Sequence, residues 1–206
     1  MSTKEREDRR VRKTRDAVVS AFNDLVRERR YEDIRVGDIV SDADVGRSTF
    51  YQYYTGKEDV LVESMGFMLD ALASAASTEV DPTALEGLLS HFWENRSLGR
   101  ELFSGPQSLH VAPRIARALA QRIEARIASR LAASGGKPLV PPRLLAIQTA
   151  EAELALIRAW LMGMGPATPS ELAEALTRSA RAMVEALLPA SPESIPRGPK
   201  RNEFGS

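Results

Sequence analysis

The chain has 206 residues, 43% of them apolar, with 28 basic and 28 acidic side chains and no cysteine. That length is enough for one large domain or two small ones with a real core. The absence of cysteine excludes a disulfide framework and fits a reducing cytosol. The polar start, MSTKEREDRR, lacks the apolar run of a signal peptide. The longest apolar stretch, near residues 154–165, is interrupted by Arg158 and is too short to span a bilayer. We therefore expect a cytoplasmic protein with no membrane partner.

Apolar residues recur at helical spacing, and no segment shows the sustained two-residue alternation of a strand. The sequence therefore predicts an all-α fold. Helix starts are marked by Asp81-Pro82 and by two sets of capping residues, Thr55 with Glu58 and Thr168 with Glu171. About nine helices are expected, near residues 12–29, 36–43, 47–53, 55–77, 82–93, 97–103, 113–133, 142–163 and 169–188.

Residues 36–54 have the pattern of a helix-turn-helix. Val36, Ile39 and Ala43 form one apolar stripe at helical spacing. The spacing breaks around Asp44-Val45-Gly46 and resumes at Phe50, so Val45 is the apolar residue that packs between the two helices. The second helix would then expose a cation, hydroxyls, an amide and phenols, which are groups that bind base edges and phosphates. These side chains are Arg47, Ser48, Thr49, Tyr51, Gln52 and Tyr53.

This segment resembles the DNA-binding domain of the TetR family of transcriptional regulators. The family pattern runs roughly T-V-x-x-I-A-x-x-A-G-V-S-x-G-T-L-Y-x-H-F-x-x-K-E-x-L. The chain departs from it at Arg30 and Asp44, where the family has Gly, at Gly46, where it has Ser, and at Tyr53, where it has His. The matching residues cover about the first third of the chain: Thr14, Arg15, Ala17, Val18, Ala21, Phe22, Leu25, Val26, Tyr31, Val36, Ile39, Ala43, Val45, Thr49, Tyr51, Lys57, Glu58 and Leu61.

The resemblance implies a DNA-binding regulator, most often a repressor, that acts as a homodimer on a palindromic operator in double-stranded DNA. Three parts of the chain follow from it. Residues 9–57 would form a three-helix DNA-binding domain, and residues 58–189 a helical domain for effector binding and dimerisation. Residues 190–206, rich in Pro, Ser and Gly, would be a disordered tail. Its last four residues, EFGS, are typical of a cloning remnant.

The DNA-contacting residues are predicted on two segments. Arg47 is the only cation on the short recognition helix, and it would bind either a guanine or a phosphate. Ser48 and Gln52 could read bases. The resemblance places Thr49, Tyr53 and Lys57 at the phosphate backbone and Tyr51 at the groove floor or at a phosphate. Residues 9–15 carry five cations, among them Arg12 and Arg15, and they form either a DNA-contacting arm or a solvated terminus.

A small, mostly apolar effector is a further expectation from the resemblance. Most of the candidate residues are aromatic or Met side chains at helical spacing, which line either a pocket or an ordinary core. Glu151 and Arg158 would be polar anchors in the pocket or part of a solvent-facing stripe. The candidates are Met65, Met68, Phe92, Trp93, Phe103, Glu151, Arg158, Trp160 and Met162.

The resemblance also implies a dimer through the last two helices. Apolar residues on one face of each helix support this interface, although the same residues could form an internal core. On the final helix they are Leu172, Leu176, Ala180, Met183 and Leu187, and on the preceding helix Ala150, Leu154, Ile157, Leu161 and Met164.

Two other classes of function were weighed. An enzyme has no support, because the chain has no cysteine, no phosphate loop and no cluster of histidine with carboxylates. His91 and His110, its two histidines, lie in different segments, so neither a metal site nor a cofactor is predicted. A helical protein-interaction module with degenerate DNA binding is the alternative. It is favoured by the 13 basic and 13 acidic residues of positions 1–60, which leave that region with no net charge.

Overall fold

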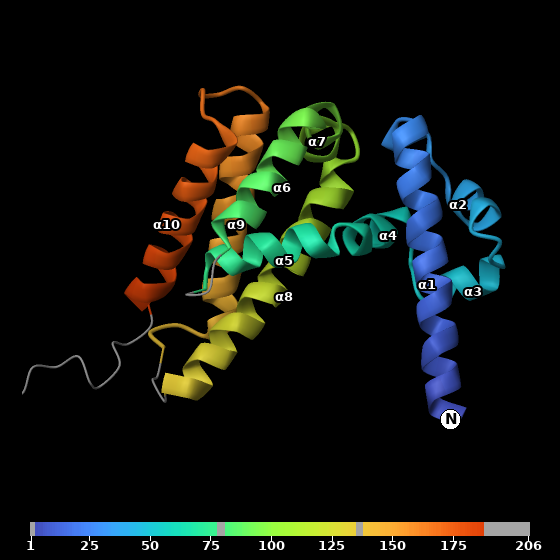
Figure 1. The fold of residues 1–206 in the computed structure, drawn as a ribbon, viewed down its shortest axis with the longest axis horizontal. Coiled ribbons are helices and arrows are strands. Elements are labelled where there is room, and N and C mark those ends of the chain that lie inside the picture. The colour runs from blue at the N-terminus through green and yellow to red at the C-terminus, as the bar shows by residue number, and fades with distance from the viewer. Residues whose placement is uncertain (1–2, 78–80, 135–137, 188–206) are drawn as a thin grey trace, which may run out of the picture.

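The computed structural model describes residues 3–77, 81–134 and 138–187, and within these ranges it contains ten α-helices, one short 3-10 helix and no strand. The predicted all-α fold is therefore confirmed. Figure 1 shows a head of α1–α3 on one side, a larger helical body on the other, and α4 running between them. The predicted tail, residues 190–206, lies outside the described residues. The elements are α1 (Thr3–Glu28), η1 (Tyr31–Asp33), α2 (Val36–Asp42), α3 (Arg47–Tyr51), α4 (Lys57–Ser64), α5 (Gly66–Ala75), α6 (Pro82–Glu94), α7 (Arg96–Ser104), α8 (Ser108–Ser134), α9 (Pro142–Leu161) and α10 (Pro169–Leu187).

The head is built around buried aromatic side chains. Phe22 of α1 meets Tyr31 edge to face, with ring centroids 6.3 Å apart, and Phe50 of α3 packs on Tyr54 at 5.2 Å. Phe50 is fully buried and Tyr54 is 4% exposed, so the prediction that both belong to the core is confirmed. Because these side chains come from α1, η1 and α3, burying them fixes the recognition helix against the rest of the head.

The expected helix at residues 55–77 is in fact two helices. The chain leaves helical geometry at Met65, whose ψ is 4°, and continues as α5 from Gly66. The predicted capping residues are also corrected. The backbone N–H and the hydroxyl of Thr55 both donate to Asp59 Oδ2, at 2.7 and 2.5 Å, and Glu58 takes no part. The second predicted set is confirmed, because Thr168 and Glu171 exchange hydrogen bonds at the start of α10.

The body is a helical bundle in which α8 packs along α9, and α10 packs against α6 and α9. The predicted start of α8 at Pro113 is wrong, because the helix begins five residues earlier, at Ser108. Pro113 therefore lies inside α8, where its missing N–H leaves the carbonyl of Leu109 without its helical partner. Among the described residues no helix has the length and apolar character needed to cross a membrane.

The apolar stripes that were predicted to form a dimer interface lie mostly inside the body. Leu172, Leu176 and Ala180 of α10 are at most 3% exposed, and Leu154 and Ile157 of α9 are at most 7% exposed. These residues pack against each other's helices and against α6 within one chain. The internal-core interpretation is therefore correct for most of the stripe, and Met164, which is 80% exposed, lies outside that core.

Glu153 on α9 is a carboxyl group inside this core. Its side chain is 2% exposed, and neither carboxylate oxygen has a hydrogen-bond partner. Burial raises the pKa of Glu153 well above its ordinary value of 4.5, because the charged form has lost its hydration. Folding therefore favours the neutral, protonated form of Glu153 over the charged form.

Replacing Glu153 by Gln should make the chain relatively more stable as the pH rises. Below pH 4.5 Glu153 is protonated in both the folded and the unfolded chain. Above pH 4.5 the unfolded chain loses this proton first, so the free energy of unfolding falls as the pH rises toward the folded-state pKa. The difference in unfolding free energy between Glu153→Gln and the original chain should grow by about 1.4 kcal/mol per pH unit in that interval. Urea unfolding between pH 5 and 8 measures it. The control is Glu151→Gln, an exposed position on the same helix. Parallel pH curves for the original chain and Glu153→Gln would contradict the assignment.

Candidate nucleic-acid interface

The turn between α2 and α3 has the geometry of a helix-turn-helix. Asp44 adopts a φ of 51°, the left-handed conformation that Asp tolerates better than most residues. The N–H of Val45 then donates to the carbonyl of Val40 at 3.0 Å, and Val45 packs against the core. Gly46 is the N-cap of α3, and its φ of −64° is open to any residue. The absence of the family's Gly and Ser at positions 44 and 46 therefore leaves the turn intact.

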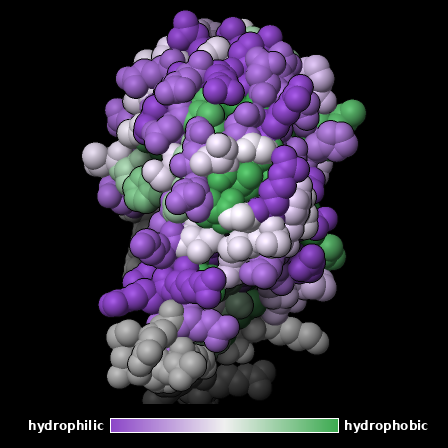
Figure 2. All heavy atoms as spheres, turned by 90° about the vertical axis from the view of Figure 1, so that its right-hand side faces the viewer, coloured by the Kyte–Doolittle hydropathy of each residue, from purple (hydrophilic) through white to green (hydrophobic). Residues whose placement is uncertain are grey.

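The outward face of α3 carries the predicted polar side chains. Arg47, Ser48 and Gln52 are exposed, and Tyr51 is 57% exposed. The guanidinium of Arg47 makes no hydrogen bond or ion pair with another described residue, and its Nη2 atom would lie 3.2 Å from a Cβ placed on Gly37. Gly37 thus leaves room for the arginine beside α2. Figure 2, which faces the head side of the molecule, shows a mostly hydrophilic surface with apolar side chains in its centre.

Two of the predicted backbone contacts occupy less open positions. Thr49 is partly buried on α3. Tyr53 lies two residues beyond the end of α3 and is 36% exposed. Its side chain lines a groove between the head and α8. Arg47, Ser48, Tyr51 and Gln52 therefore make up the exposed reading surface of the recognition helix.

Lys57 has a role that the sequence did not predict. Its ammonium group donates to the backbone carbonyls of Tyr31 and Ile34, at 2.7 and 2.8 Å, and lies 4.3 Å from the centre of the Tyr31 ring. Burial lowers the pKa of Lys57, although nearby carboxylates oppose this shift. In this structure the amine holds the loop between α1 and α2, and the predicted phosphate contact of Lys57 remains a prediction.

The N-terminal cations also differ from the prediction. Residues 9–15 belong to α1, so they form an extension of a helix and not a separate arm. Arg15 is engaged with Glu63 of α4, with Nε 3.0 Å from Oε1 and Nη2 3.0 Å from Oε2, and the hydrogen bond with Glu63 raises the pKa of Arg15. In this structure Arg15 links α1 to α4, and its predicted DNA contact remains a prediction. Arg12 is exposed and has no partner among the described residues, as a phosphate contact requires.

Four of the predicted effector residues line one cavity. Met65, Met68, Phe92 and Phe103 surround a space of about 540 Å³ between the head and the body, together with Phe22 of α1. The described residues that line the cavity include no acid, and the polar ones are Asn23, Arg27, Ser64, His91, Asn95 and Ser97. Its size falls in the range of small-molecule pockets.

The other predicted effector residues lie elsewhere. Trp93 stacks on Trp160 with ring centroids 4.8 Å apart, and Trp160 Nε1 donates to the carbonyl of Ala167 at 2.8 Å, so this pair is structural. The sulfur of Met162 lies 3.5 Å from the Ser104 hydroxyl. Glu151 and Arg158 are exposed on α9, which corresponds to the solvent-facing interpretation. No group of described residues is arranged to hold a metal ion.

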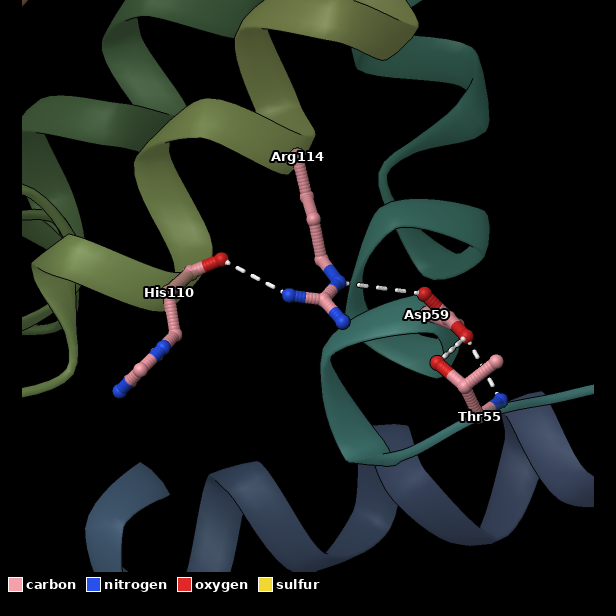
Figure 3. Close-up of polar contacts among 4 residues, drawn as sticks. All are labelled: Thr55, Asp59, His110 and Arg114. Carbon is pink, nitrogen blue, oxygen red and sulfur yellow. Dashed lines mark hydrogen bonds and ion pairs between the residues drawn. The ribbon is translucent and has the colours of Figure 1, made fainter.

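The ion pair between Asp59 and Arg114 was missed by sequence reasoning. Arg114 of α8 places Nε 3.3 Å from Asp59 Oδ1, and its Nη1 donates to the carbonyl of His110 at 3.3 Å (Figure 3). Burial raises the pKa of Asp59, but the hydrogen bonds from Thr55 and Arg114 outweigh burial and hold the pKa below its ordinary value. The Thr55 to Asp59 spacing is the one local signal in the sequence, and nothing in the sequence points to Arg114.

Comparison with known proteins gives the fold a name. No protein-family model matches the chain. The TetR-family repressor AlkX from Dietzia sp. strain DQ12-45-1b superposes with a TM-score of 0.52 and 20% identity, over 84% of this chain and 98% of AlkX. The TetR-family repressor FadR from Thermus thermophilus, solved with lauroyl-CoA, gives 0.50 and 21%, over 86% and 97%. The chain has the TetR-family fold.

The sequence also has a curated relative with this kind of DNA-binding element. It is 38% identical over 75 residues to YxbF, an uncharacterized HTH-type transcriptional regulator of Bacillus subtilis. The match spans 34% of this chain and about one fifth of YxbF. Together with the helix-turn-helix geometry, these findings confirm the predicted resemblance to the TetR family. The head of this TetR-family fold includes α3 with its exposed polar side chains. The mostly apolar cavity lies where the head meets the body.

Proposed function

We propose that the chain is a DNA-binding transcriptional regulator, a ligand-responsive repressor that acts as a homodimer on a palindromic operator. The observation that carries the proposal is the exposed polar face of α3, where Arg47 has no partner among the described residues. Such a helix can enter the major groove, with Arg47 binding a guanine or a phosphate, and Ser48, Tyr51 and Gln52 beside it. Arg12 at the exposed surface of α1 would add a phosphate contact.

The alternative is an interaction module that has lost DNA binding. The pairing of charged side chains within the head weakens this alternative. Several acids of the head have partners within the chain. Asp38 accepts from the N–H of Arg35 at 2.8 Å and lies 3.8 Å from Arg29, and Glu32 lies 2.6 Å from Arg30. The zero net charge of residues 1–60 therefore still allows Arg47 and Arg12 to act as unpaired cations.

DNA titrations with three variants test the proposal. The sites are those that the protein selects from random duplexes. Arg47→Ala should weaken binding to the selected site by about tenfold to a hundredfold, and weaken binding to random DNA much less. Arg12→Ala should weaken both, and lower the slope of log affinity against log salt by about one. Lys57→Met should weaken binding with the slope unchanged, since its amine holds the head together.

The control for these titrations is Arg96→Ala, because Arg96 is an exposed arginine at the start of α7 that donates to the carbonyl of Trp93 and is not part of α3, α9 or α10. Equal losses for Arg96→Ala and Arg47→Ala would contradict the assignment of the recognition helix. Failure to select any palindromic site at low salt would count against the regulator as a whole.

A dimer would use the outer faces of α9 and α10, since the predicted stripes are mostly internal. One recognition helix reads only a few base pairs, so useful affinity needs two heads. The exposed side of α9 includes Leu144, Ala155 and Leu156, and that of α10 includes Ala175 and Ala182. Small side chains allow two helices to approach closely, and the exposed leucines provide apolar area to bury.

The substitution Ala155→Arg should convert the dimer to a monomer. A long charged side chain at the centre of a close helix contact would have to be buried or would hold the helices apart. Sedimentation equilibrium should give twice the chain mass of 22.6 kDa for the original protein and one chain mass for the variant. Ala128→Arg, at an exposed position of α8, is the control and should stay dimeric. A dimeric Ala155→Arg would place the interface elsewhere.

The effector would occupy the cavity lined by Met65, Met68 and Phe92, and its binding would be coupled to DNA if the two states of the head differ in affinity for it. The neutral apolar dye N-phenyl-1-naphthylamine should bind there with saturable fluorescence. Met68→Trp, which fills the cavity, should abolish the signal. Phe67→Trp, at the adjacent position with 77% exposure, should preserve it. Equal signals from both variants would contradict the cavity as the binding site.

A further inference from the structure

A second, polar groove lies where the head meets α8. It encloses about 820 Å³ and is open to solvent. One wall comes from the head and α4, with Tyr53, Thr55 and Asp59, and the other from residues 109–122 of α8. This groove is separate from the cavity of Met65 and Phe92, because the two linings share no residue.

The wall formed by α8 presents a row of hydrogen-bond donors. His110, Arg114, Arg117 and Gln121 follow one another at intervals of four, three and four residues, so they lie on one face of the helix about 5–6 Å apart. The guanidinium of Arg117, the ring of His110 and the amide of Gln121 make no hydrogen bond with another described residue. Arg114 uses Nε and Nη1, which leaves Nη2 free for a ligand.

The charges of the groove favour an anion. Its lining holds four arginines and two carboxylates, which leaves an excess of two positive charges before His110 is considered. Both carboxylates already have cationic partners: Glu63 binds Arg15 and Asp59 binds Arg114. Arg122 is paired with Asp70 outside the lining. Arg117 is the arginine of the lining that is left without a carboxylate partner among the described residues.

We propose that this groove binds a small molecule that carries two or more phosphate or carboxylate groups, held by Arg117, Arg114 and His110. Arginine binds both groups through parallel hydrogen bonds, and the helical spacing of these donors suits two anionic groups on one ligand. The chemistry differs from that of the apolar cavity, so the groove would recognise a different class of compound.

Binding in this groove would also reach the DNA-facing head. An anion bound at Nη2 of Arg114 repels the Asp59 carboxylate that is paired with Nε of the same guanidinium. Asp59 in turn holds the N–H and hydroxyl of Thr55, four residues after the end of α3 (Figure 3). Weakening the Asp59–Arg114 pair therefore loosens α8 from the start of α4. This regulatory part rests on the proposed function as a DNA-binding regulator, whereas the binding of the anion does not.

Isothermal titration of the full chain with pyrophosphate, and separately with citrate, tests the site at constant ionic strength and without DNA. Saturable binding of one or both is expected, and the preferred one identifies a phosphate or a carboxylate ligand. Arg117→Gln should weaken it by about tenfold or more, since one charge-assisted pair is lost. Arg178→Gln on α10 is the matched control and should leave the affinity unchanged. No saturable binding of either anion, or equal weakening by the two variants, would overturn the site.

The coupling has its own measurement, which is hydrogen exchange at the amide of Thr55. An anion concentration that just saturates the original chain should increase the exchange rate of this amide in the original chain and in Arg178→Gln, and should increase it less in Arg117→Gln. Unchanged exchange in the presence of tightly bound anion would overturn the coupling and leave the site standing. Because neither measurement uses DNA, a failure here is distinguishable from a failure of DNA binding.

Discussion

The eight residues of α4 hold the head and the body of this protein in one arrangement. At its first residue, the ammonium of Lys57 binds the carbonyls of the loop that precedes α2. Two residues later, Asp59 pairs with Arg114 of α8, and Glu63 pairs with Arg15 of α1. Since each of these contacts joins a different segment to the same short helix, a displacement of α4 would alter the position of the recognition helix relative to the body.

Both candidate binding sites are lined in part by residues of α4. The mostly apolar cavity takes Leu61 and Ser64 from α4, and the polar groove takes Asp59 and Glu63 from the other side of the same helix. A ligand in either space contacts both the head and the body. It could therefore favour one arrangement of α4 over another, which is the differential affinity that any allosteric effect needs.

The net charge of the head does not show which of its cations are unpaired, because that depends on the partners of each side chain. Residues 1–60 carry no net charge, yet Arg15 and Lys57 are engaged within the chain while Arg47 and Arg12 are free of partners among the described residues. A sequence count treats these four cations alike. The structure separates them, because Arg15 has an ion-pair partner and Lys57 has carbonyl partners, whereas Arg47 and Arg12 have neither among the described residues.

The sequence by itself determined the helices, the helix-turn-helix and the core role of Phe50 and Tyr54, because these depend on local spacing, capping and turn residues such as Asp44 and Thr168. It also determined which polar side chains α3 exposes. The break at Met65, the inward use of Lys57 and Arg15, and the burial of the α10 stripe were decided only by the tertiary structure. Each depends on which distant segment lies opposite, as Arg114 lies opposite Asp59, 55 residues away. Helical periodicity identifies a face to be covered, but the partner that covers it is fixed only when the helices pack.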